Sequence, residues 1–332
     1  MATDRARMFE GKPRDAAGAA VAYPSAMIRS VMNRSDWALL LTLALIWGGA
    51  FFLISVAVRE VAPLTYVWAR LSIAAAAMWL FLAWRGEPVG LPTSVWRSIL
   101  VLALLNNVVP FILFGWGQTQ IASGLASILN ATTPIWGVVV AHLYTRDERL
   151  TGRKLAGVLL GFAGVTVMIG PALLTSLGGD TLAQLACVTA ALCYALAGVW
   201  ARRFRAMGLP PVAVTTGQLT AGALMMLPLT LLVDRPWLEA LPSPGAIAAI
   251  VALALVCTSF AYILYFRLID SAGATNALLV TLLVPPIAIL LGALFLGEMI
   301  GPRDLTGLAL IAIGLAAIDG RILTRLRRPV VA

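Results

Sequence analysis

The chain has 332 residues, of which 61% are hydrophobic and only 12% are charged, and its net charge is +9. Soluble domains carry about twice that charged share, so the composition excludes an ordinary water-soluble protein and indicates a protein embedded in lipid. The cations form short clusters between apolar segments, without a basic stripe or interleaved aromatic residues. The positive charge therefore does not indicate a nucleic-acid partner.

The N-terminal segment is more polar than the rest of the chain. Residues 1–35 are basic and contain no apolar run of the kind that a secretory signal peptide requires. We expect this segment to be a disordered cytoplasmic tail, which ends where Ser35 or Asp36 caps the first helix.

From residue 36 on, the chain is a series of long apolar segments joined by short linkers. A helix needs roughly 20 apolar residues to cross the hydrocarbon core of a bilayer. The sequence therefore predicts an all-α integral membrane protein of ten transmembrane helices, without a separate soluble domain. The predicted spans are 37–58, 64–84, 97–118, 124–145, 152–171, 181–201, 212–233, 245–267, 273–296 and 304–321.

Lysine and arginine are distributed unevenly between the two sides of the predicted bundle. With the N-terminus inside, the inner segments hold 20 of them and the outer segments hold three, which are Arg59, Arg235 and Arg303. Cytoplasmic loops carry the excess of these residues in membrane proteins. We therefore expect a multi-pass protein of a cell inner membrane with both termini in the cytoplasm.

The second half of the chain repeats the first at a shift of 150 positions. The predicted repeats are residues 36–171 and 180–322, followed by a cytoplasmic tail over 323–332. Each repeat has five spans, an odd number, so the second repeat enters the membrane from the opposite side. Inverted repeats are typical of transporters, which open one site alternately to either side; a symmetric scaffold or a channel is the alternative. Six of seven compared pairs are identical: Glu148/Glu298, Gly152/Pro302, Arg153/Arg303, Leu155/Leu305, Gly157/Gly307, Leu160/Leu310 and Gly164/Gly314.

Glycines recur on one face of the fifth and tenth spans. Gly157, Gly161 and Gly164 are spaced by 4 and 3 residues, and Gly307 and Gly314 occupy matching places in the second repeat. Small residues at helical spacing let two membrane helices approach closely. The pattern predicts a packing face without a role in binding.

Polar residues and prolines gather near the middle of four spans, and they predict a substrate cavity. An amide or hydroxyl in hydrocarbon faces a partner or a cavity, and proline frees a backbone carbonyl one turn earlier. Hydrogen bonding between helices is the alternative role. The candidates are Asn106 and Asn107 in the third span, Asn130 and Pro134 in the fourth, Thr258, Ser259, Tyr262 and Tyr265 in the eighth, and Thr281 and Pro285 in the ninth.

Two aromatic residues and one cation extend this set. Trp47 and Trp136 fall near mid-span, where they could stack on a flat solute, with helix packing as the alternative. Arg70 lies roughly 10 Å past Pro63, at 1.5 Å per helical residue. That depth is compatible with snorkelling to the outer surface, with pairing to Glu60, and with pairing to a substrate carboxylate.

Acidic side chains are missing from the middle of every predicted span. A proton-coupled exporter of cationic drugs needs such a carboxylate. The sequence therefore favours a neutral or zwitterionic solute, with a proton-coupled multidrug antiporter as the alternative. One histidine and three cysteines predict no metal, cofactor or disulfide framework, and no catalytic constellation indicates an enzyme. The oligomeric state stays open, and a monomer is compatible with the sequence.

Several of these motifs resemble those of the drug/metabolite transporter superfamily. They are Trp47-Gly48-Gly49, Arg70, and the connectors Asp147-Glu148 and Gly297-Glu298. Over residues 36–322 the chain is most similar to the EamA family, and within it to the aromatic amino-acid exporters. The resemblance implies ten helices around a central cavity formed by spans 1, 3, 4, 6, 8 and 9, with the fifth and tenth peripheral. It also implies export of small metabolites by alternating access, with aromatic and large neutral amino acids as preferred substrates.

Overall fold

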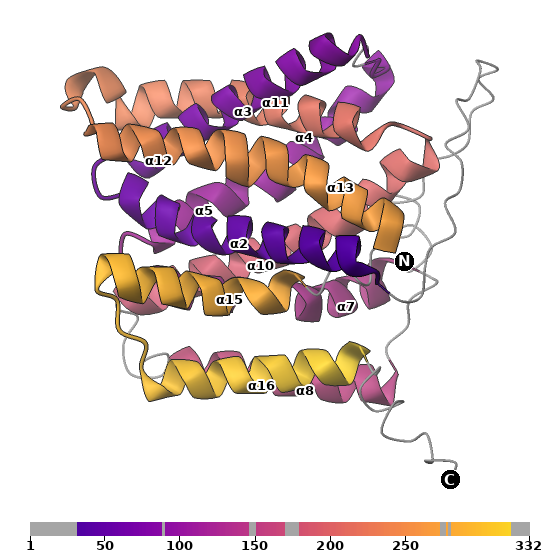
Figure 1. Cartoon of the computed structure of the whole chain (residues 1–332), viewed down its shortest axis with the longest axis vertical. Helices are drawn as coiled ribbons and strands as arrows, with labels where there is room; N and C mark the ends of the chain where they lie inside the picture. Colours follow the sequence, from indigo (N-terminus) through magenta and orange to yellow (C-terminus); the bar gives the residue numbers. More distant parts are fainter. Residues whose placement is uncertain are drawn as a thin grey trace.

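The computed structural model describes residues 32–87, 90–145, 151–169, 179–272, 277 and 280–319. Every regular element in these ranges is helical, which confirms the predicted all-α class. The helices lie side by side and cross the molecule in the same general direction (Figure 1). Most of the predicted tails, the connector with Glu148, and the C-terminal end of the second repeat fall outside the described residues.

Several long helices are built from two or more consecutive elements. The first half of the chain contains α2 (Arg34–Ala57), α3 (Pro63–Arg85), η1 (Thr93–Val95), α4 (Trp96–Ala103), η2 (Leu104–Val108), α5 (Val109–Gly117), α6 (Ser123–Asn130), α7 (Thr133–Tyr144) and α8 (Gly152–Ile169). The second half contains α10 (Gly179–Ala206), α11 (Pro211–Leu229), η3 (Thr230–Asp234), η4 (Pro236–Leu238), α12 (Pro244–Ala254), η5 (Leu255–Phe260), α13 (Ala261–Ala272), α15 (Val280–Leu291), η6 (Gly292–Leu296) and α16 (Pro302–Asp319).

The length and hydropathy of these helices agree with a multi-pass membrane protein. Among the described residues, 7 helices are long and apolar enough to cross a bilayer, and Lys154–Val167 and Leu283–Leu296 form shorter apolar helices. Large apolar side chains such as Leu80, Leu224 and Leu294 are exposed on the outside of the bundle. In water such a surface would be costly, whereas lipid tails solvate it.

The first helix begins slightly earlier than the sequence suggests. Asn33, rather than Ser35 or Asp36, is the N-cap of α2, because its side chain accepts a hydrogen bond from the Asp36 backbone N–H at 2.8 Å. The Asp36 carboxylate accepts in return from the Asn33 backbone N–H at 3.0 Å. This reciprocal arrangement is a capping box, in which Asp36 occupies the third helical position. The predicted tail over 1–35 therefore includes the start of a helix.

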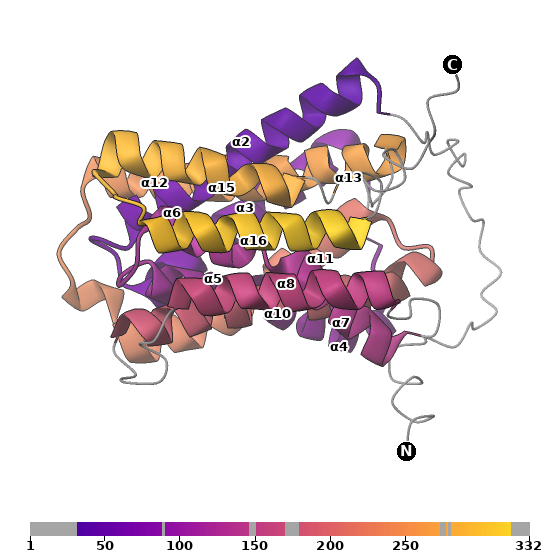
Figure 2. The ribbon, with the colours of Figure 1, turned by 90° about the horizontal axis from the view of Figure 1, so that it is seen from below.

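The outermost layer of the bundle consists of α8 and α16, which lie next to one another in both views (Figures 1 and 2). A Cβ added to Gly164 would lie 2.7 Å from the backbone oxygen of Gly307, and one added to Gly314 would lie 2.6 Å from that of Gly157. The predicted glycine packing face is therefore confirmed. Since the early glycine of each helix faces the late glycine of the other, α8 and α16 run antiparallel.

Candidate functional site

Four π-helical segments occur among the described residues, and two of them lie within a long helix rather than at its end. These turns, η2 and η5, interrupt the spans 93–117 and 244–272. A π turn inserts an extra residue into a helix and recurs at functional sites. η2 carries Asn106 and Asn107, and η5 carries Thr258 and Ser259, all of which the sequence analysis selects as site residues. The sequence analysis did not predict the π geometry.

The side chains of η5 satisfy backbone carbonyls that the widened turn leaves exposed. The Thr258 hydroxyl donates to the Leu253 carbonyl at 2.8 Å, and the Ser259 hydroxyl donates to the Ala254 carbonyl at 3.0 Å. Both side chains are buried. Thr258 and Ser259 thus stabilise the π turn, and the Thr258 oxygen remains able to accept a hydrogen bond.

The amides of η2 meet a tyrosine and a glutamine from two other helices. Asn106 Nδ2 donates to Tyr262 Oη at 2.9 Å and to Gln218 Oε1 at 3.2 Å, and Asn107 Nδ2 donates to Tyr262 Oη at 3.5 Å. We call Asn106, Asn107, Gln218 and Tyr262 the amide cluster. Sequence reasoning missed Gln218, although it is an amide within an apolar span and is buried like Asn107.

One acceptor of the amide cluster is unused. The Asn107 side chain is 0% exposed, and its Oδ1 has no hydrogen-bond partner. A buried carbonyl without a donor is unfavourable, because it has given up water without a replacement. Asn107 therefore offers a free acceptor to any donor that enters the bundle here.

Arg70 lies beside this cluster, buried within α3. Its side chain is 5% exposed, its Nε donates to Thr258 Oγ1 at 2.9 Å, and its guanidinium carbon lies 3.9 Å from the Phe111 ring centroid. Thr258 is one helical turn before Tyr262, so Arg70 and the amide cluster share one region of the bundle. Two of the three expectations for Arg70 are wrong, because it does not snorkel and Glu60 instead binds Ser243.

The charge of Arg70 has no counter-ion among the described residues. The ion pair found there joins Arg85 to Glu87, at the C-terminal end of α3 and 15 residues after Arg70. A guanidinium has five N–H donors, and the partners of Arg70, which are the Thr258 and Tyr66 hydroxyls and the Phe111 ring, carry no negative charge. The site therefore combines an unneutralised cation with a free carbonyl acceptor.

Aromatic residues border the amide cluster on the side of α2. The Trp47 ring lies 5.3 Å from the Tyr265 ring, centroid to centroid, and Tyr265 follows Tyr262 on α13. Tight packing of α2 on α15 positions Trp47, since a Cβ on the neighbouring Gly48 would lie 2.6 Å from Ile287. Of the predicted aromatic residues, Trp47 thus contacts Tyr265, which lies three residues after Tyr262 of the amide cluster.

The fourth predicted span is broken where the sequence places Pro134. α6 ends at Asn130 and α7 begins at Thr133, and the Thr133 hydroxyl donates to the Asn130 carbonyl at 2.7 Å. Trp136 packs edge-on against Phe162 of α8 at 4.7 Å between ring centroids, and its buried Nε1 has no acceptor. The structure therefore groups Trp136 with α8 and α10 rather than with the amide cluster.

The ninth predicted span contributes less definite contacts. Thr281 is half-buried and Pro285 is buried in α15, which packs against α2 and α6. Asn276, another polar residue of this span, lies outside the described residues. The substrate roles of Thr281, Pro285, Asn130, Pro134 and Trp136 stay predictions.

Three carboxylates bind helix N-termini at one end of the bundle, which we call the capped end. Glu298 accepts from Ser123 N at 2.9 Å and Ser123 Oγ at 2.7 Å; Asp234 accepts from Thr65 N at 2.7 Å; and Glu60 accepts from Ser243 N at 2.7 Å. Each pair joins the first half of the chain to the second. A carboxylate at a helix N-terminus neutralises free N–H groups and the positive end of the helix dipole.

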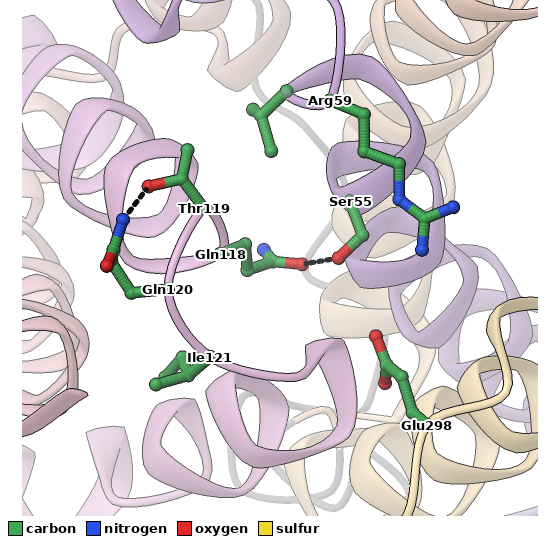
Figure 3. Close-up of a pocket in the computed structure, with 8 residues that line it drawn as sticks. Ser55, Arg59, Gln118, Thr119, Gln120, Ile121 and Glu298 are labelled. Carbon is green, nitrogen blue, oxygen red and sulfur yellow. Dashed lines mark hydrogen bonds between the residues drawn. The ribbon is translucent and has the colours of Figure 1, made fainter. Parts of the chain in front are cut away.

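A cavity of about 420 Å³ opens at the capped end (Figure 3). Its lining contains none of the residues that the sequence analysis selects. The residues around it are Ser55, Val58, Arg59, Gln118, Thr119, Gln120, Ile121 and Glu298. Four of them, Gln118 to Ile121, come from the connection between α5 and α6. Polar residues are common in such connections, so the sequence alone does not indicate a binding site there.

Comparison with known proteins decides the class of the molecule. The model of the EamA-like transporter family matches residues 37–170 and, a second time, residues 181–318. The chain belongs to the EamA-like transporter family. It is therefore a membrane transporter, which confirms the coarse prediction from the sequence and disfavours the enzyme alternative.

Relatives of this EamA-like transporter extend over most of its length. The uncharacterized transporter YoaV of Bacillus subtilis is 24% identical over 83% of this chain and 94% of its own. A probable terminal-alkyne amino-acid exporter of Streptantibioticus cattleyicolor is 26% identical over 89% of this chain and 97% of its own. The uncharacterized inner membrane transporter YedA of Escherichia coli K12 is 25% identical over 84% and 89%.

A solved structure shares the fold of this EamA-like transporter. It superposes with a TM-score of 0.62 at 21% identity and covers 89% of this chain and 100% of its own. At that identity the likeness establishes the fold alone. None of these comparisons shows a preference for aromatic amino acids.

Proposed function

We propose that this EamA-like transporter exports zwitterionic amino acids by alternating access. Large neutral and aromatic amino acids are its preferred substrates. The observation that carries the proposal is the buried Arg70, which has no anionic partner among the described residues and lies beside the free Asn107 carbonyl. These two groups are complementary to the two poles of an α-amino acid.

The carboxylate pole of the substrate pairs with Arg70. A charge within a membrane is costly unless it is paired, and intramembrane arginines accordingly mark substrate pathways. Arg70 N–H groups not used by Thr258 are arranged as a fork that matches a carboxylate. Binding thereby neutralises a charge that the empty protein leaves uncompensated.

The ammonium pole is recognised by oxygen atoms of the amide cluster. An ammonium group has three donors, and Asn107 Oδ1 is an acceptor that no protein group occupies. Tyr262 Oη, which already accepts from Asn106, lies next to it. Trp47 and Tyr265 provide apolar faces for the side chain of the substrate.

The proposed architecture is ten spans in two inverted five-helix repeats. The family model matches the chain twice. The helices α8 and α16 pack antiparallel, as expected for two elements related by a two-fold axis in the membrane plane. Helix neighbours also occur as related pairs: α2 with α15 corresponds to α10 with α7, and α10 with α5 corresponds to α2 with α13. These relations support one shared site that two similar halves expose in turn.

The proposed location is a cell inner membrane, with the capped end outside and both termini in the cytoplasm. The name of the Escherichia coli relative YedA supports the location. The excess of Lys and Arg at the opposite end supports the orientation, because positively charged loops remain in the cytoplasm.

Transport by purified protein in liposomes tests this proposal. We expect saturable counterflow of radiolabelled L-phenylalanine by the wild type, and at least about a 10-fold loss in Arg70→Gln, since a hydrogen-bonded charge pair is worth roughly 1.5–3 kcal/mol. Arg303→Gln removes an exposed cation and is the matched control.

Substrate analogues and a pH gradient separate the alternatives. We expect phenylalaninamide, which lacks the carboxylate, to compete poorly with L-phenylalanine. Counterflow that does not saturate would indicate a channel, and an obligatory pH gradient would indicate a proton-coupled antiporter. Equal transport by Arg70→Gln and the wild type would disprove the role of Arg70.

A further inference from the structure

The cavity at the capped end contains a buried donor that the described protein leaves unpaired. Gln118 is 7% exposed, and its Oε1 accepts from the Ser55 hydroxyl at 2.9 Å (Figure 3). This bond fixes which end of the amide faces Ser55. The Gln118 Nε2 is thereby directed elsewhere and has no acceptor. The wall of the cavity thus contains a water-shielded, unpaired donor that a second side chain holds in place.

A cation lies on the same wall of the cavity. Arg59 follows Ser55 by four residues, which is about one helical turn, so both side chains lie on the same side of the end of α2. Arg59 is exposed, and the ion pair found among the described residues does not involve it. Arg59 therefore brings N–H donors to the cavity, and the unpaired Gln118 Nε2 lies within its wall.

Glu298 gives the cavity a negative pole. Its carboxylate accepts three hydrogen bonds, from Ser123 N, Ser123 Oγ and Gly124 N. A carboxylate has about four lone-pair sites, so Glu298 retains one for another donor. Figure 3 shows Arg59 and Glu298 on either side of the Ser55–Gln118 pair. The cavity therefore has a cationic and an anionic region, whereas the Arg70 region combines a cation with a neutral acceptor.

The position of this cavity relates it to the proposed substrate pathway. Trp47, beside the amide cluster, and Ser55, at the cavity, are both on α2 and are eight residues apart, or about 12 Å along a helix. A volume of about 420 Å³ lies within the range of small-molecule sites. It is sufficient for one amino acid.

We infer that this cavity is a second binding site for zwitterionic amino acids, on the exit side of the transporter. Gln118 and Arg59 bind the carboxylate, Glu298 binds the ammonium group, and Ser55 positions the Gln118 amide. The side on which the site lies and the class of its ligand rest on the proposed function.

An engineered thiol in the cavity gives a local readout of binding. Thr119 lines the cavity and is exposed, whereas the three native cysteines are buried, so Thr119→Cys provides one reactive thiol. We expect L-phenylalanine to slow modification of this thiol by a membrane-impermeant maleimide about 10-fold when the site is about nine-tenths occupied. Phenylalaninamide should not protect the thiol.

Added substitutions separate this site from the amide cluster. Gln118→Leu and Arg59→Gln, each in the Thr119→Cys protein, should abolish protection, whereas Arg303→Gln should retain it. Gel filtration of each variant establishes that the folded protein is being labelled. Arg70→Gln should lose transport and keep protection, which makes the failure of either proposal distinguishable.

The same experiment can overturn the inference. Protection that persists in both Gln118→Leu and Arg59→Gln would disprove it. Failure of L-phenylalanine to protect the thiol of the Thr119→Cys protein without further substitutions would also disprove it. Loss of protection in Arg70→Gln would assign the effect to the amide cluster and would also disprove a separate site.

Discussion

At the scale of single residues, the central region of this transporter is defined by incomplete pairing. Arg70 has only neutral partners, two hydroxyls and one ring, and Asn107 has a carbonyl with no partner. Proteins rarely leave such groups unsatisfied, because each has lost its hydration. In the function that we propose, the substrate supplies the missing partners, and its binding would therefore stabilise the bundle.

Glu60 is a residue whose effect depends on pH. Hydrogen bonds from the Ser243 backbone N–H and hydroxyl hold the pKa of this carboxyl below its usual value of 4.5. A depressed pKa contributes stability above the unfolded-state pKa, and this contribution is lost as the pH falls through the folded-state pKa. We expect the melting temperature of the wild type to exceed that of Glu60→Gln at pH 7, and the difference to shrink below about pH 4.5.

Glu239 provides the control for that measurement. Glu239 is exposed and lies four residues before Ser243, the partner of Glu60. The Glu239→Gln substitution should leave the melting temperature unchanged across the same pH range. A constant difference between the wild type and Glu60→Gln from pH 7 to pH 3 would show that the ionised carboxylate does not stabilise this contact.

Sequence reasoning found part of the central site because amides within apolar spans are rare. Asn106 and Asn107 are predicted on that basis, and Tyr262 and Tyr265 on their helical spacing with Thr258. Gln218 is absent from the predicted set, although Thr215 precedes it by three residues. Trp136 is in that set because mid-span depth does not specify the direction of a side chain. The orphan nitrogen of Gln118 depends on its contact with Ser55, 63 residues away in the chain, which no local pattern encodes.

At the scale of helices, the all-α class and the approximate spans follow from hydropathy, whereas the internal breaks do not. The π turns η2 and η5 arise in apolar sequence that reads as continuous helix. Pro134 does mark the break between α6 and α7. Proline is a local signal because it lacks an N–H and clashes with the preceding turn, and a π turn has no equivalent residue.

The contact of α8 with α16 provides a test of helix packing. A Cβ at position 314 would lie 2.6 Å from the backbone oxygen of Gly157, and backbone does not give way as a side chain can. We expect Gly314→Ala to destabilise the protein by about 1–3 kcal/mol, the usual cost of overpacking. Thermal or denaturant unfolding in detergent measures this change.

A glycine in open space is the appropriate comparison. An added Cβ at Gly198 in α10 meets nothing within 4 Å. Gly198→Ala should be neutral or stabilising by up to about 1 kcal/mol, because alanine is the better helix former. Equal effects of Gly314→Ala and Gly198→Ala would show that α8 and α16 do not meet through these glycines.

At the scale of the whole molecule, the two halves correspond to one another along the sequence and, as proposed, cross the membrane in opposite directions. Thr151 and Met299 lie at the equivalent connectors of the two halves, and both are exposed. We expect a membrane-impermeant maleimide to modify Met299→Cys in intact cells and Thr151→Cys only after the membrane is permeabilised. Modification of both from the same side would disprove the inverted arrangement.

The three carboxylates of the capped end also constrain how this end can open. Each belongs to one half of the chain and binds a helix of the other half, so the halves cannot part here while any one contact is kept. Separation must transfer several anions and several helix N-termini to water in one movement. In the proposed transport cycle, this end would therefore open only when all three contacts break together.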